Sequence, residues 1–324
     1  MLLRRKRIGV GLFLGIVSLS AFRTLEPGPP ASYPLALDFS TDFSSLAPLD
    51  AMVLRYNVFI SGEAHNVAGN EQRHFKLFAY LHRRAGVRYY VKEGSYTYAY
   101  FVDCYVQTGQ AQWLDSAATS LREPIGSDLA PATKREFALW RHLRELNQTA
   151  PADQKIRVVA IDTEPYWTGS LLHDLVARYP QVPGTLQPII QQLQALRSQH
   201  PLNGMQLHRL DKQRIKPILA SAWEQVQAHK AEARAWLGDD YRHLEVLVNN
   251  PAAFHRSDGE LAENFGRLRA ELPPGNYFLQ YGRLHAQINK STLTGPWLAE
   301  SLRQGNWVMS FIPYYQNCLA AWNN

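Results

Sequence analysis

The sequence lacks the short motifs that identify many enzyme classes. It contains no G-x-S-x-G, no Walker loop, no G-x-G-x-x-G turn and no H-E-x-x-H helix. Their absence argues against a serine-elbow hydrolase, a P-loop nucleotide site, a dinucleotide site and a zincin. The only cysteines are Cys104 and Cys318, which are too few for a disulfide framework and lack C-x-x-C spacing. Export would permit them to pair, and a buried free thiol at Cys104 is the alternative.

Acidic residues are absent before Glu26, whereas Arg4, Arg5, Lys6 and Arg7 form a basic cluster that precedes the uncharged run 8–22. A basic cluster followed by a short apolar run predicts a secretory signal peptide or an uncleaved N-terminal anchor over residues 1–22. We therefore expect the protein to be exported, periplasmic or extracellular, or membrane-anchored with its body facing outward. Without that cluster the net charge of +6 falls to about +2, so a nucleic-acid partner is not expected.

The rest of the chain reads as a linker followed by one domain. Residues 23–50 are rich in proline and serine, and the domain is expected over 51–324. Alternating strand and helix patterns predict an α/β fold with a mostly parallel central sheet flanked by helices. A helical insertion over 170–250 is expected to form a lid or a side wall. The strands are expected at 52–60, 87–91, 156–161, 276–281 and 307–312, and the helices of the first half at 70–85, 96–106 and 133–147.

Acids and histidines follow the predicted strands at the points where they end. The carboxyl ends of parallel strands lie at one edge of a sheet, so these side chains are expected to converge there. His74 lies on the helix after the first strand. The amino end of this helix starts at the same edge, so His74 could also point toward it. The residues at strand ends are Glu63 and His65, Glu93, Asp162 and Glu164, and His285.

Histidines among carboxylates support two chemistries. In the first, a histidine oriented by an acid deprotonates water, which attacks an ester or amide carbonyl. In the second, Glu63, His65, Glu93 and His285 bind a divalent metal such as zinc or manganese that activates the water. A buried acid–histidine network without turnover is the remaining alternative.

Several motifs resemble the erythromycin esterase-like family, in the same order along about residues 51 to 312. This family is related to a wider group that contains haem-binding uptake lipoproteins and Tiki-type metalloproteases. The motifs are Gly62-Glu63-Ala64-His65, the helix with Glu71 and His74, Tyr89-Tyr90-Val91-Lys92-Glu93-Gly94, Ala160-Ile161-Asp162, the helix start from Arg256 to Asn264, Gly282-Arg283-Leu284-His285 and Gly295-Pro296-Trp297-Leu298.

The resemblance implies an α/β hydrolase with a cleft at the strand ends and a small-molecule substrate. His65 would be the general base, Glu63 and Glu93 its supporting acids, and His285 a second essential imidazole. Apart from the resemblance, we expect Arg256, His74 and Asp162 to bind substrate. The cofactor is unknown: the hydrolytic reaction requires none, and a divalent metal or haem is the alternative. The implied rivals are a haem- or metal-binding protein without turnover and a catalytically degenerate member.

The sequence departs from the family pattern in two places. The esterases usually have one more residue between the first acid and the histidine than Glu63-Ala64-His65 provides. They also commonly carry H-x-x-H in the late motif, where this chain has Gly282 and His285. The sequence therefore indicates neither a macrolide substrate nor any other specific one.

Overall fold

A computed structural model describes most of the chain from Leu35 to Pro313, and these described residues lie within one compact unit. The described residues are 35, 38–65, 67–121, 129–162, 169–198, 204–249, 257–292 and 295–313, with the backbone alone for 197, 198, 204–214 and 216. The expected signal or anchor at 1–22 and residues Glu164, Arg256 and Cys318 lie outside these ranges. Among the described helices, none has both the length and the apolar character to span a bilayer.

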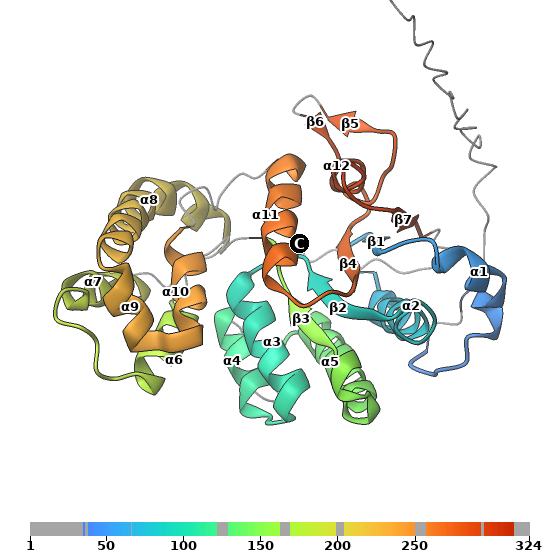
Figure 1. The fold of residues 1–324 in the computed structure, drawn as a ribbon, viewed down its shortest axis with the longest axis horizontal. Helices are drawn as coiled ribbons and strands as arrows, with labels where there is room; N and C mark the ends of the chain where they lie inside the picture. Colours follow the sequence, from blue (N-terminus) through green and yellow to red (C-terminus); the bar gives the residue numbers. More distant parts are fainter. Residues whose placement is uncertain are drawn as a thin grey trace, which may run out of the picture. The chain divides into compact units, whose positions relative to one another are not determined.

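Five parallel strands form the central sheet in the order β3-β2-β4-β1-β7 (Figure 1). In the register of the central strands, Glu63 of β1 is opposite Gly282 of β4, and Lys92 of β2 is opposite Gln280. The carboxyl ends of these strands therefore finish at one edge, as predicted. The strands are β1 (Val58–Glu63), β2 (Val87–Lys92), β3 (Arg157–Val159), β4 (Asn276–Gly282) and β7 (Val308–Phe311), with a separate antiparallel pair β5 (Ser291–Thr292) and β6 (Gly295–Pro296).

The first strand is shorter at its start than the apolar run 52–60 suggested. Met52 belongs to the short helix α1 (Asp50–Val53), and the strand begins at Val58. Between them the chain turns, because Arg55 N and Tyr56 N donate to the carbonyls of Met52 and Val53. An apolar run can thus serve two elements when a turn interrupts it.

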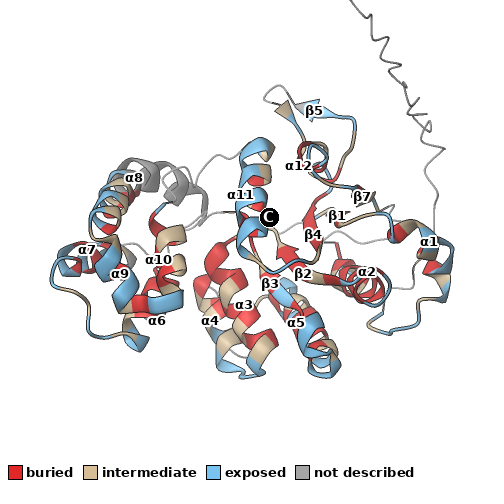
Figure 2. Cartoon of the chain, in the orientation of Figure 1, coloured by how far each residue is buried: buried red, intermediate tan, exposed pale blue. Residues whose placement is uncertain are grey.

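Helices cover both faces of the sheet, which confirms the predicted α/β architecture. On one face Phe78 of α2 packs against Tyr90 and Phe278, and Trp140 of α5 packs edge-on against Tyr90. On the other face, α11 and α12 contribute Phe265 and Leu298 to a cluster with strand residues. Figure 2 shows α2 and α3 buried along most of their length. The helices are α2 (Asn70–Ala85), α3 (Tyr96–Thr108), α4 (Gln112–Ser120), α5 (Pro131–Thr149), α11 (Asp258–Glu271) and α12 (Leu298–Leu302).

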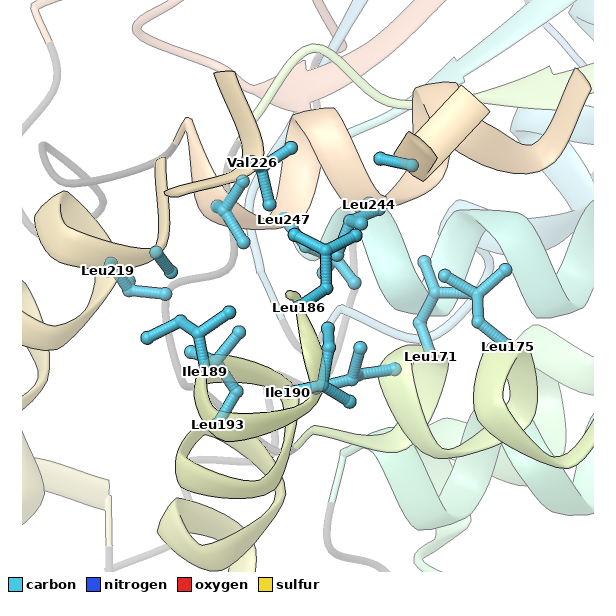
Figure 3. Packing of buried hydrophobic residues seen from close by; sticks show 14 of the residues in the cluster. Leu171, Leu175, Leu186, Ile189, Ile190, Leu193, Leu219, Val226, Leu244 and Leu247 are labelled. Carbon is cyan, nitrogen blue, oxygen red and sulfur yellow. The ribbon is translucent and has the colours of Figure 1, made fainter. Parts of the chain in front are cut away.

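The helical middle of the chain has a core of its own, made of leucine and isoleucine side chains such as Leu186, Ile190 and Leu244 (Figure 3). Hydrogen bonds join it to α3: the Tyr96 hydroxyl lies 2.9 Å from His243 Nδ1, and Arg178 donates to the Tyr100 hydroxyl at 2.8 Å. This segment was predicted as a helical insertion. Its helices are α6 (Ser170–Arg178), α7 (Gln187–Ser198), α8 (Gly204–Ala228), α9 (Lys230–Leu237) and α10 (Tyr241–Val248).

The residues before the sheet pack on α2. A 3₁₀ turn, Ser44–Leu49, buries Leu46 and Leu49. Lys76 Nζ, on a nearly fully buried side chain of α2, lies 2.6 Å from Asp38 Oδ1, and Phe39 stacks on His142 of α5. Residues 38–49 of the expected linker are thus held against the domain.

Cys104 lies on α3 and is half-buried. Burial raises the pKa of its thiol to about 12, so the thiol is unreactive at neutral pH.

Candidate active site

His65 is presented by the loop between β1 and α2. The strand ends at Glu63, and α2 begins at Asn70 after Gly69, whose φ of 95° is accessible mainly to glycine. Asn70 Nδ2 donates to the Ala64 carbonyl at 2.8 Å, which ties the loop to the start of the helix. The loop therefore holds His65 directly beyond the end of β1.

Glu63 contacts several of the polar side chains of the site. Its Oε1 lies 3.0 Å from His65 Nδ1, and its Oε2 accepts from Gln280 Nε2 at 3.0 Å. The Tyr90 hydroxyl donates to Gln280 Oε1 at 2.6 Å and so fixes the orientation of that amide. The side chain of Glu63 is 11% exposed, whereas that of His65 is 63% exposed. A buried carboxylate thus holds one nitrogen of a solvent-facing imidazole, and Nε2 has no hydrogen-bond partner among the described residues.

The two partners shift each other's protonation. Burial alone would raise the pKa of Glu63. The hydrogen bond from His65, followed by the electrostatic effects of the nearby His74 and Lys92, outweighs burial and lowers that pKa to about 2. The Glu63 hydrogen bond in turn raises the pKa of His65 above its ordinary value. Glu63 is therefore ionised at neutral pH, and it favours the proton on His65 Nδ1.

His74 lies beneath Glu63, with its side chain completely buried. Arg73 donates to its Nε2 at 2.8 Å, so the neutral ring carries its proton on Nδ1, which lies 3.5 Å from Glu63 Oε2. Burial and the neighbouring Arg73 lower the pKa of His74 well below its ordinary value. The sequence analysis expected His74 to bind substrate, but the structure places it behind Glu63 and away from solvent.

Glu93 lies on the other side of the same edge. Its Oε2 accepts from the backbone N of Gly282 at 2.7 Å, and its Oε1 lies 3.8 Å from His285 Nε2. Burial raises the pKa of this carboxyl group. Lys92, the residue before it, directs its amine to the Glu93 carbonyl and to Glu136 of α5. Glu93 thus stands between the two histidines without a strong ion pair to either.

Gly282 marks the point between the two imidazole rings. A Cβ built on Gly282 would lie 3.2 Å from His65 Nε2 and 3.5 Å from His285 Cδ2. The backbone of Gly282 also donates to Glu93. A bare glycine therefore leaves a space that borders both rings and the carboxyl group of Glu93.

His285 has its own carboxylate. Asp258, the first residue of α11, places Oδ1 3.0 Å and Oδ2 2.9 Å from His285 Nδ1. Although burial opposes protonation, the Asp258 hydrogen bond and charge raise the pKa of His285. The sequence analysis did not assign this acid a role. The available signal was its place at a helix start, Ser257-Asp258, within a motif of the resemblance.

Asp162 reaches the same edge but faces inward. Its Oδ2 accepts from Gly94 N at 2.7 Å and from the Tyr281 hydroxyl at 3.0 Å. These contacts tie the end of β3 to the turn after β2. Five of the strand-end residues thus gather as predicted, Glu63, His65, Glu93, Asp162 and His285, while Glu164 and Arg256 lie outside the described residues.

A pocket of about 570 Å³ lies elsewhere, on the helical segment, where Arg178, Tyr179, Glu232 and Trp236 are among its lining residues. None of the candidate site residues lines it. The candidate active site is therefore at the strand ends, where acids and histidines with shifted pKa values lie together.

Glu63 predicts a specific dependence of stability on pH. Because its folded pKa is about 2 and its ordinary value is 4.5, ionised Glu63 stabilises the fold above pH 4.5, and that stability is lost as pH falls toward 2. The wild type should lose up to about 3 kcal/mol more than Glu63→Gln over that interval. Urea unfolding at a series of pH values measures the difference.

Glu232→Gln is the matched control, since Glu232 also pairs with a histidine, His229, but is largely exposed. Hydrogen bonds from Thr185 and His229 also lower the pKa of Glu232, but solvent screens this exposed carboxylate. Glu232→Gln should therefore change the pH dependence of the unfolding free energy much less than Glu63→Gln does. Parallel curves for the wild type and Glu63→Gln would contradict a buried, ionised Glu63.

Comparison with known proteins shows the fold. No protein-family model matches the chain, and no curated protein matches it by sequence. Among solved structures, a Bacillus cereus protein has a TM-score of 0.58 at 18% identity over 84% of this chain and 68% of its own. A succinoglycan biosynthesis protein has a TM-score of 0.56 at 15% identity over 78% of this chain and 64% of its own.

The third similar structure is a mutant of the erythromycin esterase EreC in its open conformation. Its TM-score is 0.54 at 15% identity, over 81% of this chain and 69% of that protein. This chain thus spans about two thirds of the length of each of these structures and shares their fold.

Proposed function

We propose that this protein is an exported hydrolase of the erythromycin esterase-like family that cleaves an ester, or an amide, of a small molecule by histidine-assisted attack of water. One observation carries the proposal: the buried carboxylate of Glu63 holds Nδ1 of the exposed His65 ring at 3.0 Å, and no other described residue binds its Nε2. This is the arrangement of a general base with its orienting acid. The shared fold with an esterase supports the reaction class.

In the proposed reaction, His65 Nε2 takes a proton from water as the oxygen attacks the carbonyl carbon. The tetrahedral intermediate then collapses, the bond to the leaving oxygen or nitrogen breaks, and His285 Nε2 gives that atom a proton. The proton on His65 returns to solvent, and His285 is reprotonated. Proton transfer by a positioned side chain contributes about 10²–10⁴-fold to rate at each step.

Glu93 would hold the water or the leaving group between the two rings. Its Oε1 remains beside His285 Nε2, while its Oε2 is engaged by Gly282. We assign His74 to positioning Glu63, because its buried ring contacts that carboxylate. Substrate contacts by Asp162 and Arg256 stay predictions.

A divalent metal is the second candidate, since one ligand atom from each of Glu63, His65 and Glu93 lies within 4.8 Å of the others. Nitrogen and oxygen donors suit zinc or manganese, and a bound metal would lower the pKa of its water. However, Glu63 Oε1 already faces His65 Nδ1, and its Oε2 faces Gln280. Glu63 would have to release or share a partner to become a ligand, so we prefer the metal-free reaction.

The test is hydrolysis of a panel of esters, amides and macrolide lactones by the purified full-length protein. We expect turnover of at least one ester that survives prolonged dialysis against a chelator. Activity that disappears with the chelator and returns with zinc or manganese would favour the metal reaction. A Soret band, together with no hydrolysis across the panel, would instead favour a haem-binding protein.

A further inference from the structure

The cap of α11 is formed without the side chain of Asp258. Ser257 caps α11, because its side chain accepts from Glu260 N at 3.3 Å and Glu260 Oε2 accepts from Ser257 N at 2.9 Å. This reciprocal capping box satisfies the start of the helix without the next carboxylate. The side chain of Asp258 is 9% exposed, so it lies in the protein interior.

The carboxylate turns instead to His285 and α12. Both of its oxygens lie within 3.0 Å of His285 Nδ1, and its Oδ2 also accepts from the backbone N of Leu298, the first residue of α12. The next backbone amide, Ala299 N, donates to the His285 carbonyl at 2.9 Å. The start of α12 therefore binds both the acid and the histidine.

Aromatic rings complete the enclosure of His285. Tyr281 and Trp297 each meet the imidazole edge-to-face, with centroids 5.7 Å away. With Asp258 on Nδ1 and the backbone held by Ala299, the ring has one favourable orientation. In that orientation Nε2 faces Glu93 Oε1 at 3.8 Å.

We propose that Asp258 is a positioning residue that fixes His285 as the Nδ1–H tautomer and holds its Nε2 toward Glu93. The edge then carries two carboxylate–imidazole pairs, Glu63–His65 and Asp258–His285, with their free nitrogens near Gly282. The catalytic consequence rests on the proposed hydrolase function; the tautomer and the orientation do not.

The charged groups around His285 fit this role. Asp258, Glu93 and Asp162 all favour its protonated form, and Asp258 contributes most because it is hydrogen-bonded. His65 is the proposed base at the same edge, and Glu63 holds the proton on its Nδ1. A second imidazole that is protonated at the start of a cycle suits donation to a leaving group.

The competing explanation is that Asp258 only anchors α12, a helix of five residues, through Leu298 N. Asp258→Asn separates the two roles, because an amide can still accept from Leu298 N but removes the charge beside Nδ1. Asp162→Asn is the matched control, since Asp162 contacts Gly94 N and the Tyr281 hydroxyl at the same edge.

The experiment records nitrogen-15 NMR spectra of the histidine rings against pH in the full-length protein. In wild type, neutral His285 should be the Nδ1–H tautomer. In Asp258→Asn its pKa should fall by about one unit or more, while that of His65 changes less. Asp162→Asn should lower the pKa of His285 less than Asp258→Asn does. If hydrolysis is found, kcat of Asp258→Asn should fall about 10²-fold or more with a small change in KM.

Two results would overturn the proposal: a neutral His285 in wild type that is the Nε2–H tautomer, or an unchanged His285 titration in Asp258→Asn. The wild-type measurement decides the matter even if the variant does not fold. A protein that hydrolyses nothing but shows the expected tautomer and pKa shift supports the positioning role and contradicts the hydrolase proposal alone.

Discussion

His65→Ala should abolish hydrolysis while leaving the fold intact. The imidazole supplies the exposed nitrogen that Glu63 orients, so its removal should lower kcat/KM by about 10³-fold or more. Its side chain is 63% exposed, and stability should change by no more than about 1 kcal/mol. Initial rates on the best ester, together with thermal unfolding, measure both quantities.

His229→Ala is the control for the loss of a histidine that pairs with a glutamate. His229 Nδ1 lies 3.3 Å from Glu232 Oε1 in the turn between α8 and α9, away from the strand ends. Its kcat/KM should equal that of the wild type. Equal activity in wild type and His65→Ala would rule out His65 as the base.

The pH dependence of kcat/KM in the wild type should also identify His65 as the base. Because Glu63 raises the pKa of His65, kcat/KM should rise with pH through a value above 6.5 as the imidazole loses its proton. In Glu63→Gln that rise should move to lower pH. A rise at unchanged pH in this variant would mean that another group is the base.

The strand ends were predictable because the sheet is parallel. The predicted strands at 87–91 and 276–281 are β-rich and are followed closely by polar residues, and a parallel sheet brings such ends to one edge. Glu63, Glu93 and His285 could therefore be placed at one edge from the sequence alone. This prediction requires only the positions of the strands, which the apolar runs in the sequence indicate.

The residues that it missed or misplaced are those that helices bring in. Asp258 starts α11, whose position over the sheet depends on packing of Phe265 and Leu268 that the sequence pattern alone does not describe. His74 was expected at the edge because α2 begins there, but the helix turns that position into the interior. Strand order fixes an edge, whereas the rotation of a helix about its axis depends on the whole core.

Gly282→Ala should disable the site with little effect on stability. Gly282 ends β4, and its backbone is not in the left-handed region, so alanine fits the main chain. The new Cβ would approach His65 Nε2 to 3.2 Å and His285 Cδ2 to 3.5 Å, and it would fill the space where the proposed reaction places its reacting atoms. Displacing a catalytic group by a fraction of an ångström to 1 Å costs about 10²-fold in rate, and we expect a loss of at least that size.

His65 can move because it is exposed, and its rotation away from the new methyl group would break its hydrogen bond to Glu63. His285 is held on several sides and should stay in place. The nitrogen-15 spectra should therefore show a changed His65 and an unchanged His285, with kcat lowered more than KM is raised.

Gly266→Ala is the matched control, because a Cβ on Gly266 of α11 meets nothing within 4 Å. It should keep full activity and stabilise the protein by about 0.5–1 kcal/mol, the usual gain for alanine in a helix. Wild-type activity in Gly282→Ala would show that the reacting atoms do not occupy the space between the two imidazoles. Both carboxylate–imidazole pairs border that space. Such a result would therefore mean that His65 and His285 do not act on one substrate there, and that the reaction takes place at a different site.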